Sequence, residues 1–512
     1  MKIILILGLY IGLCVGLRAQ PTIQWQRAFG GSDSDDAYSV QQTLDGGYIV
    51  SGSTVSIDGD VFGNHGGSEY WVLKLNEDGQ LSWKKTYGSS NNEGCYKSIQ
   101  TSDGGFVLAG FTNSNSGQVS GNHGDLDAWI VKINATGGIQ WQKCFGGTLW
   151  EEAWSITETN DGGFVFAGRT SSTDGDVTGF HGALDFWVVK ISNDGEIQWQ
   201  KALGGSDIDL GYVVKQTSDA GYIIIGESLS NDGDAHGANG NGDYWVVKLN
   251  PSGQIVWTHL LGGPSLDRAN DVWETEDGSF VVFGHITNDG GDVSTHYGGY
   301  DWWLIKIDAT GDLVWEKTYG GSKDDFSRSI FQTSDGGFVM AGSTNSKDGD
   351  VQDNDGGVDF LLIRIDSSGN ILWQKTLGGT MGERAYSISG TADGGYVTAG
   401  FAWSNNGDVS GVHGVSDYWI VKLAPETATT QTPAAIPLNL YPNPATQWIT
   451  LNLPIIEQNM QVNITDEQGK LLLTRTIRTD EKLDIAVLPR GVYWVSAVSK
   501  SGQVYAGKFV KG

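Results

Sequence analysis

Short apolar runs, separated by glycine-rich polar stretches, recur along most of the chain. Examples are YWVLKL (70–75) and FWVVKI (186–191), which are nearly continuous in apolar residues rather than alternating. Such runs are typical of strands covered on both faces of a sheet. Asp-Gly pairs and other glycine turns lie between the runs, and no stretch keeps a helical period. The pattern therefore predicts many short β-strands and excludes a helix-based fold.

The pattern repeats with a fixed period. Tryptophan recurs every 58 residues, at Trp25, Trp83, Trp141, Trp199, Trp257, Trp315 and Trp373. Glycine columns keep the same spacing, at Gly30, Gly88, Gly146, Gly204, Gly262, Gly320 and Gly378 and at Gly52, Gly110, Gly168, Gly226, Gly284, Gly342 and Gly400. A long period kept without insertions indicates a propeller or a solenoid.

Each repeat is expected to hold four strands, called a, b, c and d. In the first complete repeat they span roughly Ala37–Gln42, Gly47–Ser53, Tyr70–Asn76 and Gln80–Thr86. Tight turns join a to b and c to d, while a long loop joins b to c. A four-stranded sheet in each repeat is the unit of a propeller blade.

The two ends of the repeat region complement each other. IQWQRAFGG (23–31) is a strand d without a strand c, and YWIVKL (418–423) is a strand c without a strand d. Pairing them would complete one more sheet and remove two exposed edges. The sequence therefore predicts an all-β chain with a seven-bladed β-propeller over residues 20–424, closed by its N-terminal strand. The turn and tryptophan of DATGDLVW (308–315) resemble pyrroloquinoline-quinone-type Trp-docked repeats. That resemblance covers strands c and d and supports the fold.

Residues 1–19 and 425–437 differ in composition from the repeats. The first segment has Lys2, an apolar run and then Leu17-Arg18-Ala19, and it is expected to be a secretory signal peptide. No other segment has the length of a transmembrane span. The Pro/Thr-rich stretch 425–437 is expected to be a linker to a last module, 438–512.

The last module carries specific motifs: LYPNPATQWITLNL (440–453), VNITDEQGKLL (462–472), LPRGVYWVSAVSKSG (488–502) and YAGKFVKG (505–512). They resemble the C-terminal sorting domain of type IX secretion in Bacteroidetes. The resemblance implies an immunoglobulin-like β-sandwich that the outer-membrane translocon recognises, with the cargo then released or attached to the cell surface. The residues that match the sorting motif are Tyr441, Pro442, Asn443, Pro444, Gly469, Gly491, Tyr493 and Lys508.

The formal net charge of the chain is −28, and the repeats carry this acid. Such a surface repels nucleic acid and anionic membranes and favours cations. Acidic loops such as DGDV (58–61, 174–177 and 348–351) are expected to share one face of the propeller, the face of the d–a and b–c loops. Two acidic side chains in a repeat are few for calcium, so we expect them to serve turn geometry, with calcium as the alternative and no other cofactor.

Regular columns of charged residues are expected to be scaffold that locks the blades together. One column is acidic: Glu69, Asp127, Asp185, Asp243, Asp301, Asp359 and Asp417. Another is basic: Lys74, Lys132, Lys190, Lys248, Lys306, Arg364 and Lys422. The recurring histidines are expected to make loop contacts rather than a zinc site: His65, His123, His181 and His413. Cys95 and Cys144 are expected to be small buried residues rather than a disulfide.

Trp150, Trp154, Trp273 and Trp403 stand outside the repeated columns. Trp150 and Trp403 fall in loops of the acidic face, and they are the candidate ligand contacts because an exposed indole stacks on a sugar ring. The sequence has no nucleophile elbow, phosphate loop or zinc-protease motif. We therefore expect a non-enzymatic secreted or cell-surface module that binds a glycan, a peptide or a surface protein. The alternative is a hydrolase or lyase that acts on polysaccharide with two carboxylates of one top-face pocket.

Overall fold

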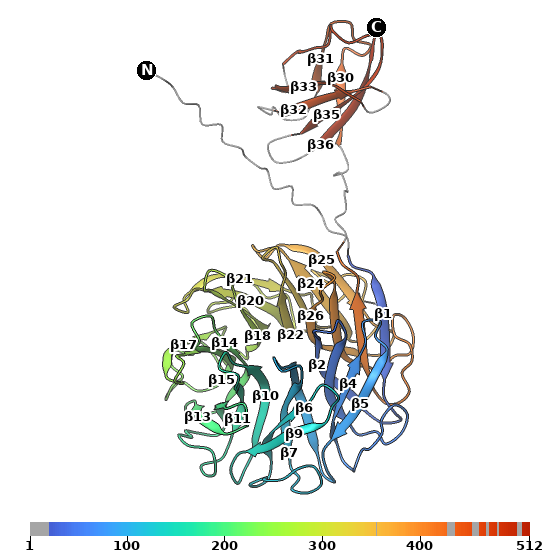
Figure 1. The fold of residues 1–512 in the computed structure, drawn as a ribbon. Helices are drawn as coiled ribbons and strands as arrows, with labels where there is room; N and C mark the ends of the chain where they lie inside the picture. The colour runs from blue at the N-terminus through green and yellow to red at the C-terminus, as the bar shows by residue number, and fades with distance from the viewer. Residues whose placement is uncertain are drawn as a thin grey trace. The chain divides into compact units, whose positions relative to one another are not determined.

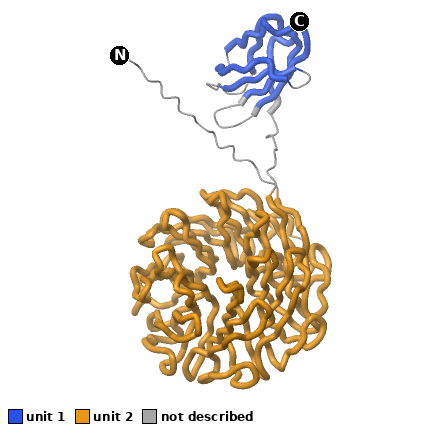
Figure 2. The backbone as a smooth tube through the Cα atoms, in the orientation of Figure 1, with its two compact units in different colours: residues 1–19, 427–512 blue, residues 20–426 orange. Residues whose placement is uncertain are grey.

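The protein is described as a computed structural model covering residues 20–354, 356–426, 436–452, 460–466, 470–478, 481–498 and 504–512. The expected signal peptide, Gly469 and most of the expected linker lie outside these ranges. Residues 20–426 form one compact unit, and the described residues from 436 onward belong to a second (Figure 2). In both units the described secondary structure consists of strands.

Residues 20–426 fold into repeated four-stranded antiparallel sheets in which neighbours in sequence are neighbours in space (Figure 1). The first complete sheet is β2 (Asp35–Gln42), β3 (Tyr48–Thr54), β4 (Glu69–Leu75) and β5 (Leu81–Tyr87). The same order recurs in β6 to β9 (Glu93–Gln100, Phe106–Thr112, Asp127–Ile133, Ile139–Phe145), β10 to β13 (Glu151–Glu158, Phe164–Thr170, Asp185–Ile191, Ile197–Leu203), β14 to β17 (Asp209–Gln216, Tyr222–Ser228, Asp243–Leu249, Ile255–Leu261), β18 to β21 (Arg268–Glu274, Phe280–Ile286, Asp301–Ile307, Leu313–Tyr319) and β22 to β25 (Asp325–Gln332, Phe338–Thr344, Asp359–Ile365, Ile371–Leu377). The expected strands are confirmed, with ends that differ by one or two residues.

One further sheet joins the two ends of the unit. It is ordered β1 (Ile23–Phe29), β28 (Asp417–Leu423), β27 (Tyr396–Ala402) and β26 (Glu383–Gly390). β1 pairs antiparallel with β28, from Ile23 opposite Leu423 to Phe29 opposite Tyr418. Figure 1 shows the sheets around a common axis, with the first strand of each sheet innermost. These inner strands contact one another in the order β2, β6, β10, β14, β18, β22, β26 and back to β2. The fold is therefore propeller-like.

The apolar core lies between neighbouring sheets. Every residue of the third strand is buried in most sheets, for example throughout β4, β8 and β12. Tyr70 shows how one sheet holds the next: its ring centroid is 4.7 Å from that of Trp129, and its hydroxyl donates to the Trp129 carbonyl at 2.8 Å. Covering both faces of a strand explains why these runs are apolar without alternation.

The basic column acts within a sheet. Lys74 Nζ lies 2.9 Å from Asp45 in the turn between β2 and β3, and Lys132 Nζ lies 2.9 Å from Asp103 in the next sheet. The other members make the same ion pair, Lys190–Asp161, Lys248–Asp219, Lys306–Asp277, Arg364–Asp335 and Lys422–Asp393. The expectation that this column locks blades to one another was therefore wrong: it ties the third strand to the hairpin of its own sheet.

The acidic column lies at the junction of neighbouring sheets, where it meets a second buried acid. Asp417 of β28 and Asp35 of β2 form one such pair, and both are fully buried. A Cβ added to Gly30 would lie 2.4 Å from Asp417 Oδ1 and 2.7 Å from Asp35 Oδ2, so no side chain fits there. Burial raises the pKa of Asp35 to about 6, and the charge of Asp417 adds to the effect. This arrangement explains the glycine column that begins with Gly30.

The recurring histidines bind the same acids. His65, His123, His181 and His413 place Nδ1 2.8, 2.7, 2.9 and 3.0 Å from Glu69, Asp127, Asp185 and Asp417. Each histidine thus contacts the carboxylate four residues later, at the start of the third strand of its sheet. Cys95 and Cys144 are free thiols and are buried, as expected.

Asp267 differs from its counterparts in the other sheets. Asp35 accepts hydrogen bonds from Thr54 Oγ1 and from Ser56 Oγ, the latter at 2.9 Å. The positions equivalent to Thr54 and Ser56 are Ile286 and Asn288, and neither carries a hydroxyl. Burial, with the charge of Asp243, raises the pKa of Asp267 to about 7. Asp267 therefore lacks the two hydroxyl donors that lower the pKa of Asp35.

The C-terminal unit has two sheets around one core. The larger is ordered β29 (Ile436–Pro437), β36 (Val504–Lys511), β35 (Gly491–Val498), β32 (Met460–Thr465) and β33 (Leu471–Ile477). The smaller is β30 (Asn439–Tyr441), β31 (Trp448–Asn452) and β34 (Leu483–Asp484). Leu440 and Ile449 of the smaller sheet share a buried cluster with Tyr493 and Phe509 of the larger. Two sheets that face one core agree with the expected sandwich.

Candidate functional site

A β-bulge interrupts the first strand of every sheet at the same place. In β2 the register moves from Ala37 opposite Gly52 to Ser39 opposite Ser51, so Tyr38 has no partner in β3. The same shift occurs in the other first strands. The residues released from the ladder are Tyr38, Tyr96, Trp154, Tyr212, Asn270, Arg328 and Tyr386. Bulges of this kind redirect side chains, and they are frequent beside functional sites.

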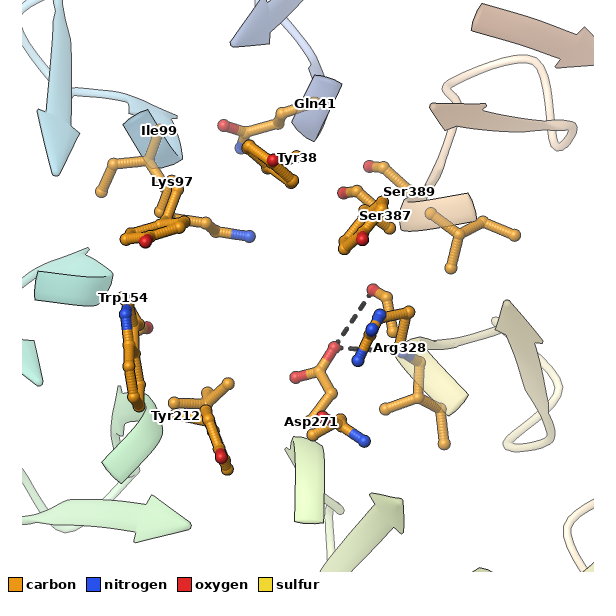
Figure 3. Close-up of a pocket in the computed structure, with 18 of the residues that line it drawn as sticks. Tyr38, Gln41, Lys97, Ile99, Trp154, Tyr212, Asp271, Arg328, Ser387 and Ser389 are labelled. Atoms are coloured by element: carbon orange, nitrogen blue, oxygen red, sulfur yellow. Dashed lines mark hydrogen bonds between the residues drawn. The ribbon is translucent and has the colours of Figure 1, made fainter. Parts of the chain in front are cut away.

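The released side chains line a cavity of about 670 Å³ between the first strands. Figure 3 shows them converging from several sheets, among them Tyr38, Trp154, Tyr212 and Arg328. All seven bulge residues belong to the lining. The cavity therefore lies on the common axis, and each sheet contributes one released side chain to it. A volume of this size falls in the range of small-molecule sites.

Aromatic rings form a continuous arc around part of this axial cavity. Ring centroids are 4.9 Å apart for Tyr386 and Tyr38, 5.9 Å for Tyr38 and Tyr96, and 6.5 Å for Tyr96 and Trp154. Trp154 and Tyr212 stack at 4.9 Å with an angle of 14° between their planes. Burial raises the pKa of Tyr38, Tyr96 and Tyr212, so their hydroxyls stay protonated. The arc offers flat apolar faces with hydroxyl groups at their edges.

The charged side chains of the axial cavity are mostly cationic. Among its described lining residues are Lys97, Lys215 and Arg328, with Asp271 as the one carboxylate. Lys215 Nζ lies 2.9 Å from Asp271 Oδ1. The other oxygen of Asp271 accepts from Ser329 Oγ at 3.2 Å and from the Ile330 amide at 3.0 Å (Figure 3). The negative charge of Asp271 is thus already matched by Lys215.

Lys97 and Arg328 have no such partner. Within the described residues neither side chain makes an ion pair or a hydrogen bond, while Arg328 lies 4.9 Å from the ring centroid of Tyr386. Both point toward the middle of the axial cavity in Figure 3. Burial lowers the pKa of Lys97; the charge of Asp271 opposes this effect and that of Lys215 adds to it. Two cations therefore face the cavity without an anion of the protein's own.

The two tryptophans chosen from the sequence lie outside the axial cavity. Trp150, in the loop before β10, is 51% exposed and lies 5.8 Å from the Arg169 guanidinium. Trp403, just after β27, is half-buried against Phe401, with centroids 5.0 Å apart. The structure places them in loops beside different sheets. Trp154 and Trp273, which the sequence reasoning set aside, do line the cavity.

The acidic loops between the second and third strands use their carboxylates to bind the backbone of the loop that precedes the first strand. Asp58, Asp174 and Asp348 accept from the amides of Ser32, Thr148 and Ser322 at 2.7, 2.8 and 2.7 Å. In the described part of the chain, no group of three or more His, Cys, Asp or Glu residues is arranged to hold a metal ion. The geometry thus agrees with the expected role in the turns.

The sorting-motif residues gather at the first and last strands of the C-terminal unit. Asn443 Nδ2 donates to the Lys508 carbonyl at 3.2 Å, and its Oδ1 accepts from the Val510 amide at 2.9 Å. Tyr493 is buried, and its hydroxyl donates to the Pro489 carbonyl at 2.8 Å. Tyr441 is exposed, Pro442 and Pro444 follow it in the same loop, and Gly491 begins β35. The motif thus ties β36 to the loop after β30.

Comparison with known proteins identifies the C-terminal unit. Residues 439–511 match the family model described as the secretion system C-terminal sorting domain. This unit is a type IX sorting domain, and the chain is exported by type IX secretion to the cell surface or the outside. Within the described ranges, no helix has the length and hydropathy of a membrane span. No curated protein matches the chain.

Several solved structures resemble the chain weakly. One is PorZ, an essential surface component of the type IX secretion system of Porphyromonas gingivalis, with a TM-score of 0.42 and 11% identity over 95% of this chain. This chain covers 60% of the length of PorZ. The Pan2 WD40 domain of Neurospora crassa gives a TM-score of 0.43 and 8% identity, over 75% of this chain and 88% of its own. A puromycin hydrolase gives 0.44 and 10%, over 93% of this chain and 60% of its own. Superpositions this weak assign no activity.

Proposed function

We propose that the chain is a secreted binding module: a closed seven-bladed propeller that receives a ligand in its axial cavity. The pairing of β1 with β28 supports closure because it covers the edge of β28 that would otherwise be free. The circular contacts of the inner strands support a ring. Export by its sorting domain delivers this module to the cell surface or the medium, where a glycan, peptide or surface protein is available.

The observation that carries this proposal is the contrast between repeated and unrepeated positions. The scaffold columns recur with the same chemistry in each sheet, as do the Lys74 ion pair and the glycine that starts with Gly30. The bulge residues change from sheet to sheet, with Asn270 and Arg328 among aromatics. Structural needs that recur around a ring produce uniform columns, whereas a ligand without that symmetry requires different groups on different sides.

The rival function, hydrolysis or elimination on a polysaccharide, needs two carboxylates placed for acid–base work. Asp271 is the one carboxylate among the described lining residues, and Lys215 neutralises it. The axial cavity therefore favours binding over this chemistry.

A glycan array probed with the full chain tests the proposal. We expect binding that falls at least about tenfold in the double variant Trp154→Ala/Tyr212→Ala, which removes the stacked pair of the arc. The matched control is Trp150→Ala, which removes an indole outside the cavity. Unchanged binding by the double variant, or a loss confined to Trp150→Ala, would contradict binding in the axial cavity and indicate a site in the loops.

A further inference from the structure

The unmatched charge in the axial cavity narrows the chemistry of the ligand. The chain has a formal net charge of −28 and carries 60 acidic residues. Against that excess, the lining residues Lys97, Lys215 and Arg328 outnumber Asp271 by two charges. Acidic residues are thus common in the repeats, yet Lys97 and Arg328 have no acidic partner among the described residues that line the cavity.

Cations that are partly removed from water and lack an anionic partner are stabilised when an anion neutralises them. Lys97 and Arg328 are both half-buried, on β6 and β22, and a hydrogen-bonded counter-ion would relieve the cost of their desolvation. Guanidinium and ammonium groups both donate well to a carboxylate. Figure 3 shows them approaching the middle of the axial cavity from different sides, with Trp154 and Tyr212 across from Arg328. A ligand in the middle can meet both cations and the arc at once.

Flat aromatic faces with hydroxyl edges suit a saccharide ring. The stacked Trp154–Tyr212 pair and the neighbouring Tyr38 and Tyr96 give apolar faces for ring C–H groups. Gln41 lies among the polar lining residues, and its side-chain NH2 group can donate to a sugar hydroxyl, while its Oε1 accepts from the Gln100 amide. The lining hydroxyls of Ser387 and Ser389 already bond to the backbone of Val40 and Gly390. The cavity of about 670 Å³ holds one or two sugar rings rather than a long segment of chain.

We infer that the axial cavity binds an acidic saccharide, a sugar ring that carries a carboxylate, with the carboxylate held by Lys97 and Arg328 and the ring against the aromatic arc. This inference rests on the proposed function, and it adds the class of ligand. The acidic loops of the exterior disfavour long polyanions, so the ligand is a terminal or single acidic sugar rather than a continuous polyuronate.

Calorimetric titration of the full chain with matched sugars tests this inference. The probes are the methyl glycosides of glucuronate, galacturonate and N-acetylneuraminate, each with a neutral counterpart: glucoside, galactoside and the neuraminate methyl ester. We expect at least one acidic sugar to bind about tenfold or more tightly than its neutral partner, since a charge-assisted pair contributes more than a neutral bond. Sodium acetate serves as the carboxylate without a ring.

Variants separate the charge from the stacking. Lys97→Met and Arg328→Gln should each lower the ratio of the affinities for the acidic and the neutral sugar by about tenfold. Lys323→Met, which removes a lysine from an exposed loop, should keep it. Unfolding midpoints of the variants report whether they fold, and we expect little change because neither cation has an anionic partner in the described structure.

The other outcomes decide between the two proposals. Equal affinity for acidic and neutral sugars, lost in Trp154→Ala/Tyr212→Ala, would overturn the acidic class and leave the binding module standing. Acetate bound as tightly as the acidic sugars would overturn the saccharide class. Titration without binding of any of these sugars would overturn the inference, while the array result judges the binding module separately.

Discussion

Replacing Asp267 by Asn should stabilise the propeller-like unit, and more strongly at alkaline than at acidic pH. Asp267 is fully buried beside Asp243 at the junction of two sheets. Its Oδ2 accepts the Gly263 amide at 2.6 Å, while Asp243 Oδ1 has no hydrogen-bond partner in the described structure. An Asn side chain can keep the first bond and donate to Asp243. It cannot acquire the charge that the site disfavours.

The sign of the pH dependence of stability follows from the pKa of Asp267 in the folded and unfolded chain. Burial raises the pKa of Asp267 from 3.8 to about 7 in the folded chain. Between these values the native state holds a proton that the unfolded state releases, so the free energy of unfolding falls as pH rises. The fall is about 1.4 kcal/mol for each pH unit and ends near pH 7. The stability that this group contributes is thus present at low pH and lost on the way to neutral pH.

The magnitude can be worked out for two buffers. At pH 8.5 the ionised Asp267 costs up to about 4 kcal/mol relative to a neutral side chain, because about three pH units separate its two pKa values. At pH 5.5 the cost is smaller by the interval from 5.5 to about 7, or about 2 kcal/mol. The advantage of Asp267→Asn should therefore be about 2 kcal/mol larger at pH 8.5 than at pH 5.5.

Guanidinium unfolding of the full chain, followed by tryptophan fluorescence, measures these differences. The matched control is Asp289→Asn, an exposed carboxylate in the loop of the same sheet, which should change stability little at either pH. Ile286→Thr offers Asp267 the hydroxyl that Thr54 gives Asp35, and should also stabilise at pH 8.5. An Asn variant whose advantage is the same at both pH values would refute the reasoning, as would a destabilised one.

Three further predictions concern closure, cations and export. Removing residues 20–30 should lower stability by several kcal/mol and cause aggregation, because β28 loses a ladder of six paired positions at roughly 1 kcal/mol for each hydrogen bond; equal unfolding midpoints would contradict closure. Millimolar calcium should raise the melting temperature slightly and no more than magnesium, with or without Asp58→Ala/Asp174→Ala/Asp348→Ala; a large calcium-selective shift lost in the triple variant would show a metal site. A chain that ends at residue 430 should fold but stay in the periplasm of a type IX-competent host, and its appearance at the cell surface would contradict the sorting role.

The sheets could be predicted because their signal is local and repeated. Tight turns and buried third strands recur at fixed spacing. A feature that occurs by chance in one repeat can therefore be recognised, because the other repeats lack it. The ion pairs of the basic column were expected between neighbouring blades, whereas each one lies within a single sheet. Sequence shows that Lys74 and Asp45 recur, but only the hairpin geometry shows that they belong to the same sheet.

The axial cavity could not be predicted because a bulge leaves no clear pattern in the sequence. Strict alternation places Tyr38 on one face of a regular strand, and the extra residue that frees it from β3 becomes visible only in the pairing register. Because the bulge could not be seen in the sequence, the exposed loop residues Trp150 and Trp403 were chosen as ligand contacts instead of Trp154. A usable signal was present: the Tyr38 column is the one in which aromatic residues give way to Asn270 and Arg328.

The acidic exterior and the cationic cavity act on different length scales. The field of the many loop carboxylates extends about one Debye length into solution, roughly 8 Å at physiological salt, and it repels any long chain of negative charges. Lys97 and Arg328 act only across a hydrogen bond, on a group that has already entered the axial cavity. A glycan with a single carboxylate is repelled only weakly by the acidic exterior, and its carboxylate can still bind Lys97 and Arg328 inside the cavity. We therefore expect added salt to change the affinity for a terminal acidic sugar little, while it weakens the exclusion of polyuronates, and the comparison of these two salt dependences separates the exterior from the cavity.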